Sequence, residues 1–115
     1  MPTGLIYHLA RKSDFDRARV AGQYDGARED NADGFMHFST ADQVVESAAR
    51  HRAGEPDLIL LAVDPDRLGA ALRWEPARGG VLFPHLYGPL SLDAIAWSRP
   101  LELGADGRHR FPDAL

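Results

Sequence analysis

The chain has 115 residues, a formal net charge of −4 and no cysteine. This length predicts one domain covering residues 1–115, long enough to bury a single hydrophobic core. The absence of cysteine excludes disulfides, thiolate nucleophiles and cysteine zinc sites. The negative net charge argues against sequence-independent binding to nucleic acid or to an anionic membrane.

The N-terminal segment shows no basic stretch, and the apolar residues 5–10 are too few and too polar for a signal peptide or a membrane span. We therefore expect a cytoplasmic protein with no membrane partner. The same segment places Ile6 beside Tyr7, and a β-branched residue next to an aromatic one favours a short strand. Ser13 is a suitable N-cap for a short helix that ends near Gly22.

Residues 23–33 are rich in glycine, aspartate, asparagine and alanine and show little periodicity. We expect an irregular surface loop here, in a position to act as a lid. Residues 34–40 then predict a strand with Phe35, His37 and Ser39 on one face.

The next helix is expected to begin at once, because Thr40 and Gln43 have the spacing of a capping box. Its predicted buried stripe consists of four small or apolar residues, Val44, Val45, Ala48 and Ala49. His37 would then lie just before a helix N-terminus, where free amides favour anionic groups such as phosphate. The alternative is a structural histidine bonded to backbone at the end of a strand.

Residues 58–63 are apolar without alternation, which is typical of a central strand covered on both faces. A return strand is expected at residues 72–75, ahead of a flexible connection at Arg78-Gly79-Gly80. A terminal hairpin is predicted around the Asp106-Gly107 turn.

The densest group of functional residue types is Phe83-Pro84-His85-Leu86-Tyr87-Gly88-Pro89. In an extended segment Phe83, His85 and Tyr87 share one face. The two prolines lack an N–H and suggest the edge or rim of a sheet. We interpret this segment as a pocket wall; the alternative is an aromatic edge strand in which His85 and Tyr87 are bonded structurally.

Three of the five histidines, His8, His37 and His85, fall near the ends of predicted strands. No two of them have the local spacing of zinc ligands, so we expect no metal site. Ser39 lacks the context of a hydrolase nucleophile. The acid expected nearest the site is Glu75, whose alternative is an exposed carboxylate at a strand end.

Several stretches together resemble the bacterial domain-of-unknown-function 952 family. They occur in the order of that family and cover most of the chain: Ile6-Tyr7-His8, Asp33-Gly34-Phe35-Met36-His37-Phe38-Ser39, residues 60–64, Trp74-Glu75 and Phe83-Pro84-His85-Leu86-Tyr87-Gly88-Pro89.

That family resembles the ADP-ribosyltransferase fold, most nearly the NAD-binding lobe of RNA 2′-phosphotransferases. Tyr7-His8, His37-Phe38-Ser39 and residues 59–64 match the order of motifs in that lobe. The resemblance implies that His8 and His37 contact the ribose and nicotinamide end of NAD, and that Tyr87 lines the same cleft. The glutamate often found at the third signature position of these transferases has no counterpart after Phe83.

We therefore expect an α+β fold in which a mixed, strongly bent sheet of about six strands carries two or three short helices. For function we expect a small NAD-using ADP-ribosyl-transfer or glycohydrolase-like enzyme; the alternative is a non-catalytic module that binds a nucleotide or another small ligand. Glu75 and His37 are the expected catalytic residues. The residues expected to bind the cofactor are Tyr7, His8, His37, Ser39, Thr40, His85 and Tyr87.

Overall fold

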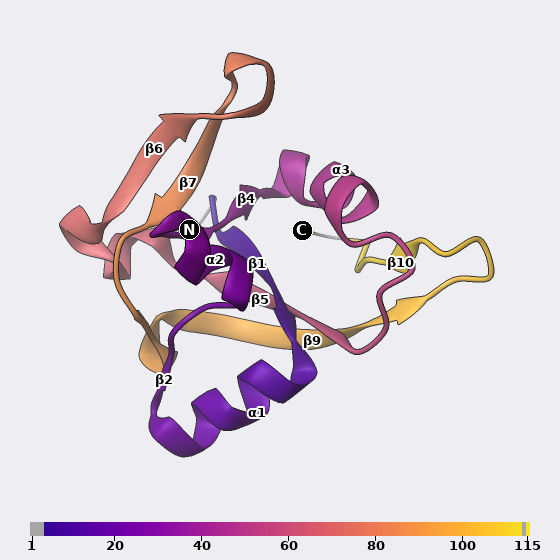
Figure 1. The fold of residues 1–115 in the computed structure, drawn as a ribbon, viewed down its shortest axis with the longest axis horizontal. Coiled ribbons are helices and arrows are strands. Elements are labelled where there is room, and N and C mark those ends of the chain that lie inside the picture. Colours follow the sequence, from indigo (N-terminus) through magenta and orange to yellow (C-terminus); the bar gives the residue numbers. More distant parts are fainter. Residues whose placement is uncertain (1–3, 114) are drawn as a thin grey trace.

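The centre of the fold is β5 (Leu58–Val63), a strand whose six residues are all buried. In the computed structural model, which describes residues 4–113 and 115, β5 lies between β1 (Ile6–Arg11) and β9 (Ile95–Leu103). The short strands β4 (Ser39–Thr40) and β10 (His109–Arg110) complete a five-stranded sheet in the order β10-β9-β5-β1-β4 (Figure 1). The sequence prediction of a central strand at residues 58–63 is confirmed.

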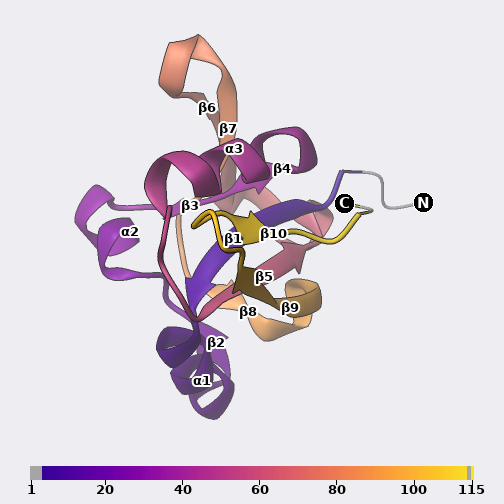
Figure 2. The ribbon, with the colours of Figure 1, turned by 90° about the vertical axis from the view of Figure 1, so that its right-hand side faces the viewer.

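Two smaller sheets accompany this one. The first has the order β3-β7-β6, and the second pairs β2 with β8. Their bounds are Met36–His37 for β3, Leu82–Leu86 for β7, Leu72–Pro76 for β6, Gln23–Tyr24 for β2 and Leu90–Ser91 for β8. Both views show the β6–β7 hairpin extending away from the body of the molecule (Figures 1 and 2).

The prediction of a mixed sheet is wrong, since every ladder among the described residues is antiparallel. A parallel pair needs a connection that returns the chain to the end where the first strand began. Here β5 begins beside the end of β1, with Leu58 opposite Arg11, and β9 begins beside the end of β5, with Ile95 opposite Val63. Each of these two connections therefore begins and ends at the same end of the sheet, so the strands that it joins are antiparallel.

The α+β class and the three α-helices found among the described residues agree with the sequence analysis. The α-helices are α1 (Lys12–Ala21), α2 (Arg28–Asp33) and α3 (Ala41–His51). Single 3-10 turns occupy Pro65–Arg67, Gly69–Ala71, Arg78–Gly80 and Leu92–Ala94. None of the described helices is both long enough and apolar enough to cross a membrane.

Helix α3 begins as predicted, because the Thr40 N–H donates to Gln43 Oε1 at 3.0 Å. Its buried face differs from the prediction: Val44, Ser47 and Ala48 are buried, whereas Val45 and Ala49 are exposed. Residues 44, 47 and 48 follow the i, i+3, i+4 spacing of one helix face, so the serine at position 47 is carried inward with its apolar neighbours.

Two hydrophobic clusters cover the two faces of β5. Ile59, Leu61 and Val63 belong to the cluster that includes Phe15 of α1, and Leu58, Leu60 and Ala62 belong to the cluster that includes Val44 of α3. Side chains of a strand alternate between faces, so β5 contributes to both clusters at once. This burial explains why its sequence is apolar throughout.

The prolines suggested that this segment lies at the edge of a sheet. In the structure, β7 is instead the middle strand of its sheet. Pro84 is tolerated there because β3, on the side away from β6, is only two residues long. The Pro84 carbonyl accepts from the Phe38 N–H at 3.0 Å, so the ladder beyond β3 uses the one group that proline offers. The terminal β9–β10 hairpin forms as predicted around Asp106 and Gly107.

Candidate functional site

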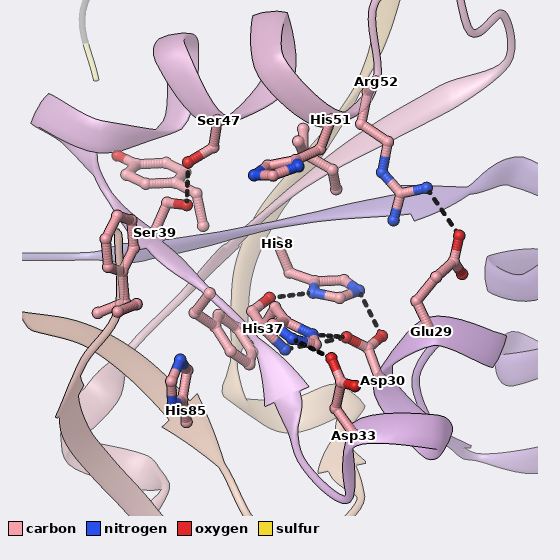
Figure 3. Close-up of a pocket in the computed structure, with 15 residues that line it drawn as sticks. His8, Glu29, Asp30, Asp33, His37, Ser39, Ser47, His51, Arg52 and His85 are labelled. Atoms are coloured by element: carbon pink, nitrogen blue, oxygen red, sulfur yellow. Dashed lines mark hydrogen bonds and ion pairs between the residues drawn. The ribbon is translucent and has the colours of Figure 1, made fainter. Parts of the chain in front are cut away.

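A cleft of about 540 Å³ lies between α2 and α3, with β1, β3 and β7 forming its floor and far wall (Figure 3). This volume is within the range of small-molecule sites. Segments far apart in the sequence therefore meet at one place. Of the predicted site residues, five line the cleft: Tyr7, His8, His37, Ser39 and His85.

The other three predicted site residues, Thr40, Glu75 and Tyr87, are not among the residues that line the cleft. Thr40 caps α3. Glu75 Oε1 lies 2.8 Å from both His85 Nδ1 and Tyr87 Oη. Glu75 therefore reaches the cleft only through His85, and its hydrogen bonds, with the His85 bond the larger cause, keep its pKa below the ordinary value.

The sequence analysis missed the carboxylate at the centre of the site, Asp30. Residues 23–33 do not form an irregular loop: they contain β2 and α2, and Asp30 is buried. Its Oδ2 accepts from the Ala27 N–H at 2.7 Å, and its Oδ1 accepts from the His37 N–H at 3.0 Å. The available signal was an acidic residue three positions after Ala27, which is the spacing of the second half of a capping box.

His37 lies between two carboxylates at the mouth of the cleft. Its Nδ1 is 2.5 Å from Asp30 Oδ1, and its Nε2 is 2.9 Å from Asp33 Oδ2. Both ring nitrogens can donate only in the imidazolium form. The hydrogen bond to Asp30 is the largest cause that raises the pKa of His37, and the charge of Asp33 acts in the same direction.

The pKa of Asp30 reflects two opposing effects. Burial alone would raise it, but the hydrogen bonds from the His37 ring and from the backbone amides of Ala27 and His37 outweigh burial and lower the pKa. The lowered pKa of Asp30 and the raised pKa of His37 both favour the form in which the two side chains carry opposite charges. Asp33 has a side chain that is 54% exposed, which leaves it free to exchange its contact with His37 for one with a ligand.

His8 is buried below this pair, on the floor of the cleft. Its Nδ1 lies 2.6 Å from the His37 carbonyl oxygen and must donate to it, while Nε2 lies 2.8 Å from Tyr24 Oη and accepts from that hydroxyl. Burial lowers the pKa of His8 and so favours this neutral tautomer. Because protein groups occupy both ring nitrogens, His8 offers a ligand its position and its ring rather than a free nitrogen.

His85 lines the cleft beside His37, on the neighbouring strand β7. The two residues are direct partners across β3 and β7, with ring centroids 5.9 Å apart. His85 stacks on Phe35 at a centroid distance of 4.1 Å. In the neutral ring, donation of Nδ1–H to Glu75 leaves the lone pair on Nε2. The strand is thus both an aromatic packing surface and a wall of the cleft.

An ion-pair network closes the end of the cleft near α2 and α3. Arg11 binds Glu29 through two parallel hydrogen bonds of 2.9 and 2.7 Å, and it reaches Glu55 at 2.9 Å. Arg52, which lines the cleft, lies 3.4 Å from the same Glu29 (Figure 3). The hydrogen bonds from Arg11 are the largest cause of the lowered pKa of Glu29. The network links the end of β1 to both helices.

The polar residues of the cleft are suited to acid–base and charge-stabilising chemistry. On the α2 side, the carboxylates of Asp30 and Asp33 contact the two ring nitrogens of His37; on the α3 side, Ser39 Oγ donates to Ser47 Oγ at 3.2 Å. Within residues 4–113 and 115, no group of three or more ligating side chains has a geometry suited to a metal ion.

Comparisons with known proteins give a consistent result. A family model described as Protein of unknown function (DUF952) matches residues 9–98. A crystal structure of Protein CC0527 from Caulobacter crescentus has 42% sequence identity and a TM-score of 0.89, and the alignment covers 92% of this chain and 93% of that one. An NMR structure of CC0527 has 41% identity and a TM-score of 0.85, with 96% of each chain covered. No curated protein matches the chain.

Proposed function

The chain belongs to the family described as Protein of unknown function (DUF952), and on that premise we propose that its cleft binds NAD and promotes cleavage of the bond between nicotinamide and ribose. The observation that carries the proposal is the meeting of Tyr7-His8, His37 and His85 around one cleft of about 540 Å³. The sequence resemblance to the NAD-binding lobe of RNA 2′-phosphotransferases relates two of these segments, Tyr7-His8 and His37, to the ribose and nicotinamide end of NAD.

The charges of the cleft suit the nicotinamide end of NAD. The nicotinamide ring is cationic, and breaking its bond to ribose moves positive charge onto the sugar. Asp30 and Asp33 line the cleft and would stabilise that charge, as carboxylates do in glycoside hydrolysis. Arg52, at the other end, would favour a phosphate of the same ligand.

The proposed reaction breaks the bond between N1 of nicotinamide and C1′ of the ribose. The electron pair of this bond leaves with the ring as neutral nicotinamide. Water or an acceptor group then adds to the ribosyl cation and loses its proton, for which Nε2 of His85 is the suitable base. Glu75 acts here as a positioning residue, because it orients His85 from outside the lining of the cleft.

A second candidate, a module that binds a nucleotide or another small ligand without catalysis, is favoured by one observation. Within the described part of the chain, every buried side-chain nitrogen or oxygen has a hydrogen-bond partner. A site whose polar groups already satisfy one another can be structural. Catalysis requires that at least one of these contacts, such as that of Asp33 with His37, opens for a substrate.

An amide NMR titration with NAD, followed by an assay of nicotinamide release, separates the candidates. We expect shifts at residues 7–9, 34–40 and 83–88, and turnover that falls at least tenfold in Asp33→Asn. Asp25→Asn is the matched control, because Asp25 is an exposed carboxylate outside the cleft lining.

Each outcome of this experiment decides between the candidates. Binding at these residues without nicotinamide release would support the non-catalytic module. An unchanged spectrum at millimolar NAD would refute both roles for this cofactor. Equal turnover in the two variants would exclude Asp33 from the reaction.

A further inference from the structure

One edge of the three-stranded sheet is open. The strand β6 is its last strand and, among the described residues, is hydrogen-bonded only to β7. The hairpin also carries several large exposed apolar side chains: Trp74 is 46%, Val81 52% and Leu82 50% exposed. Proteins usually protect such an edge, because its unpaired backbone groups can pair with another chain.

The direction of the free backbone groups follows from the hydrogen bonds of the hairpin. The Ala77 N–H donates to the Val81 carbonyl at 2.9 Å, and the Tyr87 N–H donates to the Ala71 carbonyl at 2.8 Å. Bonded and non-bonded pairs alternate along an antiparallel ladder, so Arg73 and Glu75 also bond to β7. The backbone groups of Leu72, Trp74 and Pro76 therefore face the open edge.

The side chains of β6 are self-complementary in charge. If two β6 strands pair antiparallel with Trp74 at the centre, Arg73 of one copy lies opposite Glu75 of the other, and the reverse pair forms at the same time. Opposite charges directly across a ladder stabilise it, and paired aromatic residues add to this. The two Trp74 side chains would lie next to each other, on the face of the sheet opposite to the one that carries Arg73 and Glu75.

We propose that this protein forms a symmetric dimer in which β6 pairs with β6 of a second copy about a two-fold axis at Trp74. The two Trp74 residues exchange backbone hydrogen bonds, and the Leu72 N–H of each copy donates to the Pro76 carbonyl of the other. Pro76 has no N–H, so the ladder ends there. In the dimer, the two outer edges of the joined sheet are the two copies of β3. This strand is only two residues long and offers little backbone for a further copy to pair with, so a closed dimer is favoured over a fibre.

The dimer also has a consequence for the cleft. Glu75 contacts His85, which lines the cleft, so the Arg73 of a second copy would lie beside the carboxylate that orients this histidine. The contact area of one short strand pair is at the low end for specific interfaces, so we expect dissociation in the micromolar range.

Sedimentation velocity on the full chain, from about 1 µM to about 500 µM, tests the proposal. We expect a concentration-dependent dimer that Trp74→Lys weakens at least about tenfold, because the two-fold axis places each new lysine opposite its own copy. Val20→Lys is the matched control, since Val20 is 91% exposed on α1, away from the hairpin. A monomer throughout the range, or a dimer that Trp74→Lys leaves unchanged, overturns the proposal.

A charge-exchange experiment tests the register itself. Arg73→Glu gives a strand with two acidic residues, and Glu75→Arg gives one with two basic residues, so each variant alone should be monomeric. Mixed in equal amounts, they should form a heterodimer of near wild-type affinity. Circular dichroism melting of each variant confirms folding, and failure of two folded variants to associate on mixing overturns the proposed pairing.

Discussion

Replacing Asp30 with asparagine should destabilise the protein more than any other change of one carboxylate in the cleft. Asp30 accepts hydrogen bonds from two backbone amides and from the His37 ring. Asparagine keeps one acceptor oxygen but turns an NH₂ group toward the remaining donors. Hydrogen bonds to a buried charge contribute roughly 1.5–3 kcal/mol each, and one or two of them are lost. We expect a loss of about 3 kcal/mol, which lowers the melting temperature of a domain of this size by about 10–15 °C.

The same variant should change how stability depends on pH. The pKa of Asp30 is lowered in the folded state, so its contribution is present above about pH 3.9 and is lost as pH falls through the folded pKa. The pKa of His37 is raised, so its contribution is complete below about pH 6.5 and is lost as pH rises through the folded pKa. The stability gap between wild type and Asp30→Asn should therefore be widest between about pH 4 and pH 6.5.

Urea unfolding of both proteins, followed by tryptophan fluorescence from about pH 3 to pH 9, measures this gap. His8 has a lowered pKa and the opposite pH dependence, but its burial is common to both proteins, so the comparison removes most of its effect. Asp33→Asn is the control: this exposed carboxylate should contribute less than about 1 kcal/mol. A loss below about 1 kcal/mol in Asp30→Asn, or a gap that stays constant from pH 4 to pH 9, would refute the reasoning.

Three further predictions concern single contacts. Tyr24→Phe leaves the Nε2 acceptor of buried His8 without a donor and should cost about 1–2 kcal/mol in urea unfolding; a neutral result would mean that His8 has another donor. Glu75→Gln should lower nicotinamide turnover with little loss of NAD binding, since Glu75 orients His85 from outside the cleft; unchanged turnover removes Glu75 from the mechanism. Gly34→Ala should lower the stability of the fold by about 1 kcal/mol, because Gly34 ends α2 with a φ of +85°. Gly34→Asn should lower it less, and thermal melting of both variants measures the difference.

The elements that the sequence predicts well are those fixed by local chemistry. The apolar run of β5 indicates burial on both faces without reference to its partners. The pair Thr40 and Gln43 defines the start of α3, because a capping box lies within four residues of chain. The turn at Asp106-Gly107 likewise depends on its own backbone.

The features that the sequence does not reveal depend on partners far along the chain. Asp30 lies in a segment with weak periodicity, and its helix is only six residues long, so packing against His37 rather than helix propensity stabilises it. The direction of the Glu75 side chain depends on the register of β6 against β7, which no local motif specifies. For the same reason the sequence places Glu75 at the site but does not distinguish a lining residue from one behind it.

The central position of β5 also governs how this chain can fold. Leu61 pairs on one side with His8 and on the other with Ser98, so its two partners lie near opposite ends of the sequence. Pairing strands that are far apart in the sequence requires closing a long loop, and the conformational entropy of that loop is lost before the contacts between the strands form. This slows folding relative to helical proteins of this size. During synthesis, β5 would leave the ribosome well before β9, and one side of an entirely apolar strand would remain open until nearly the whole chain had been made.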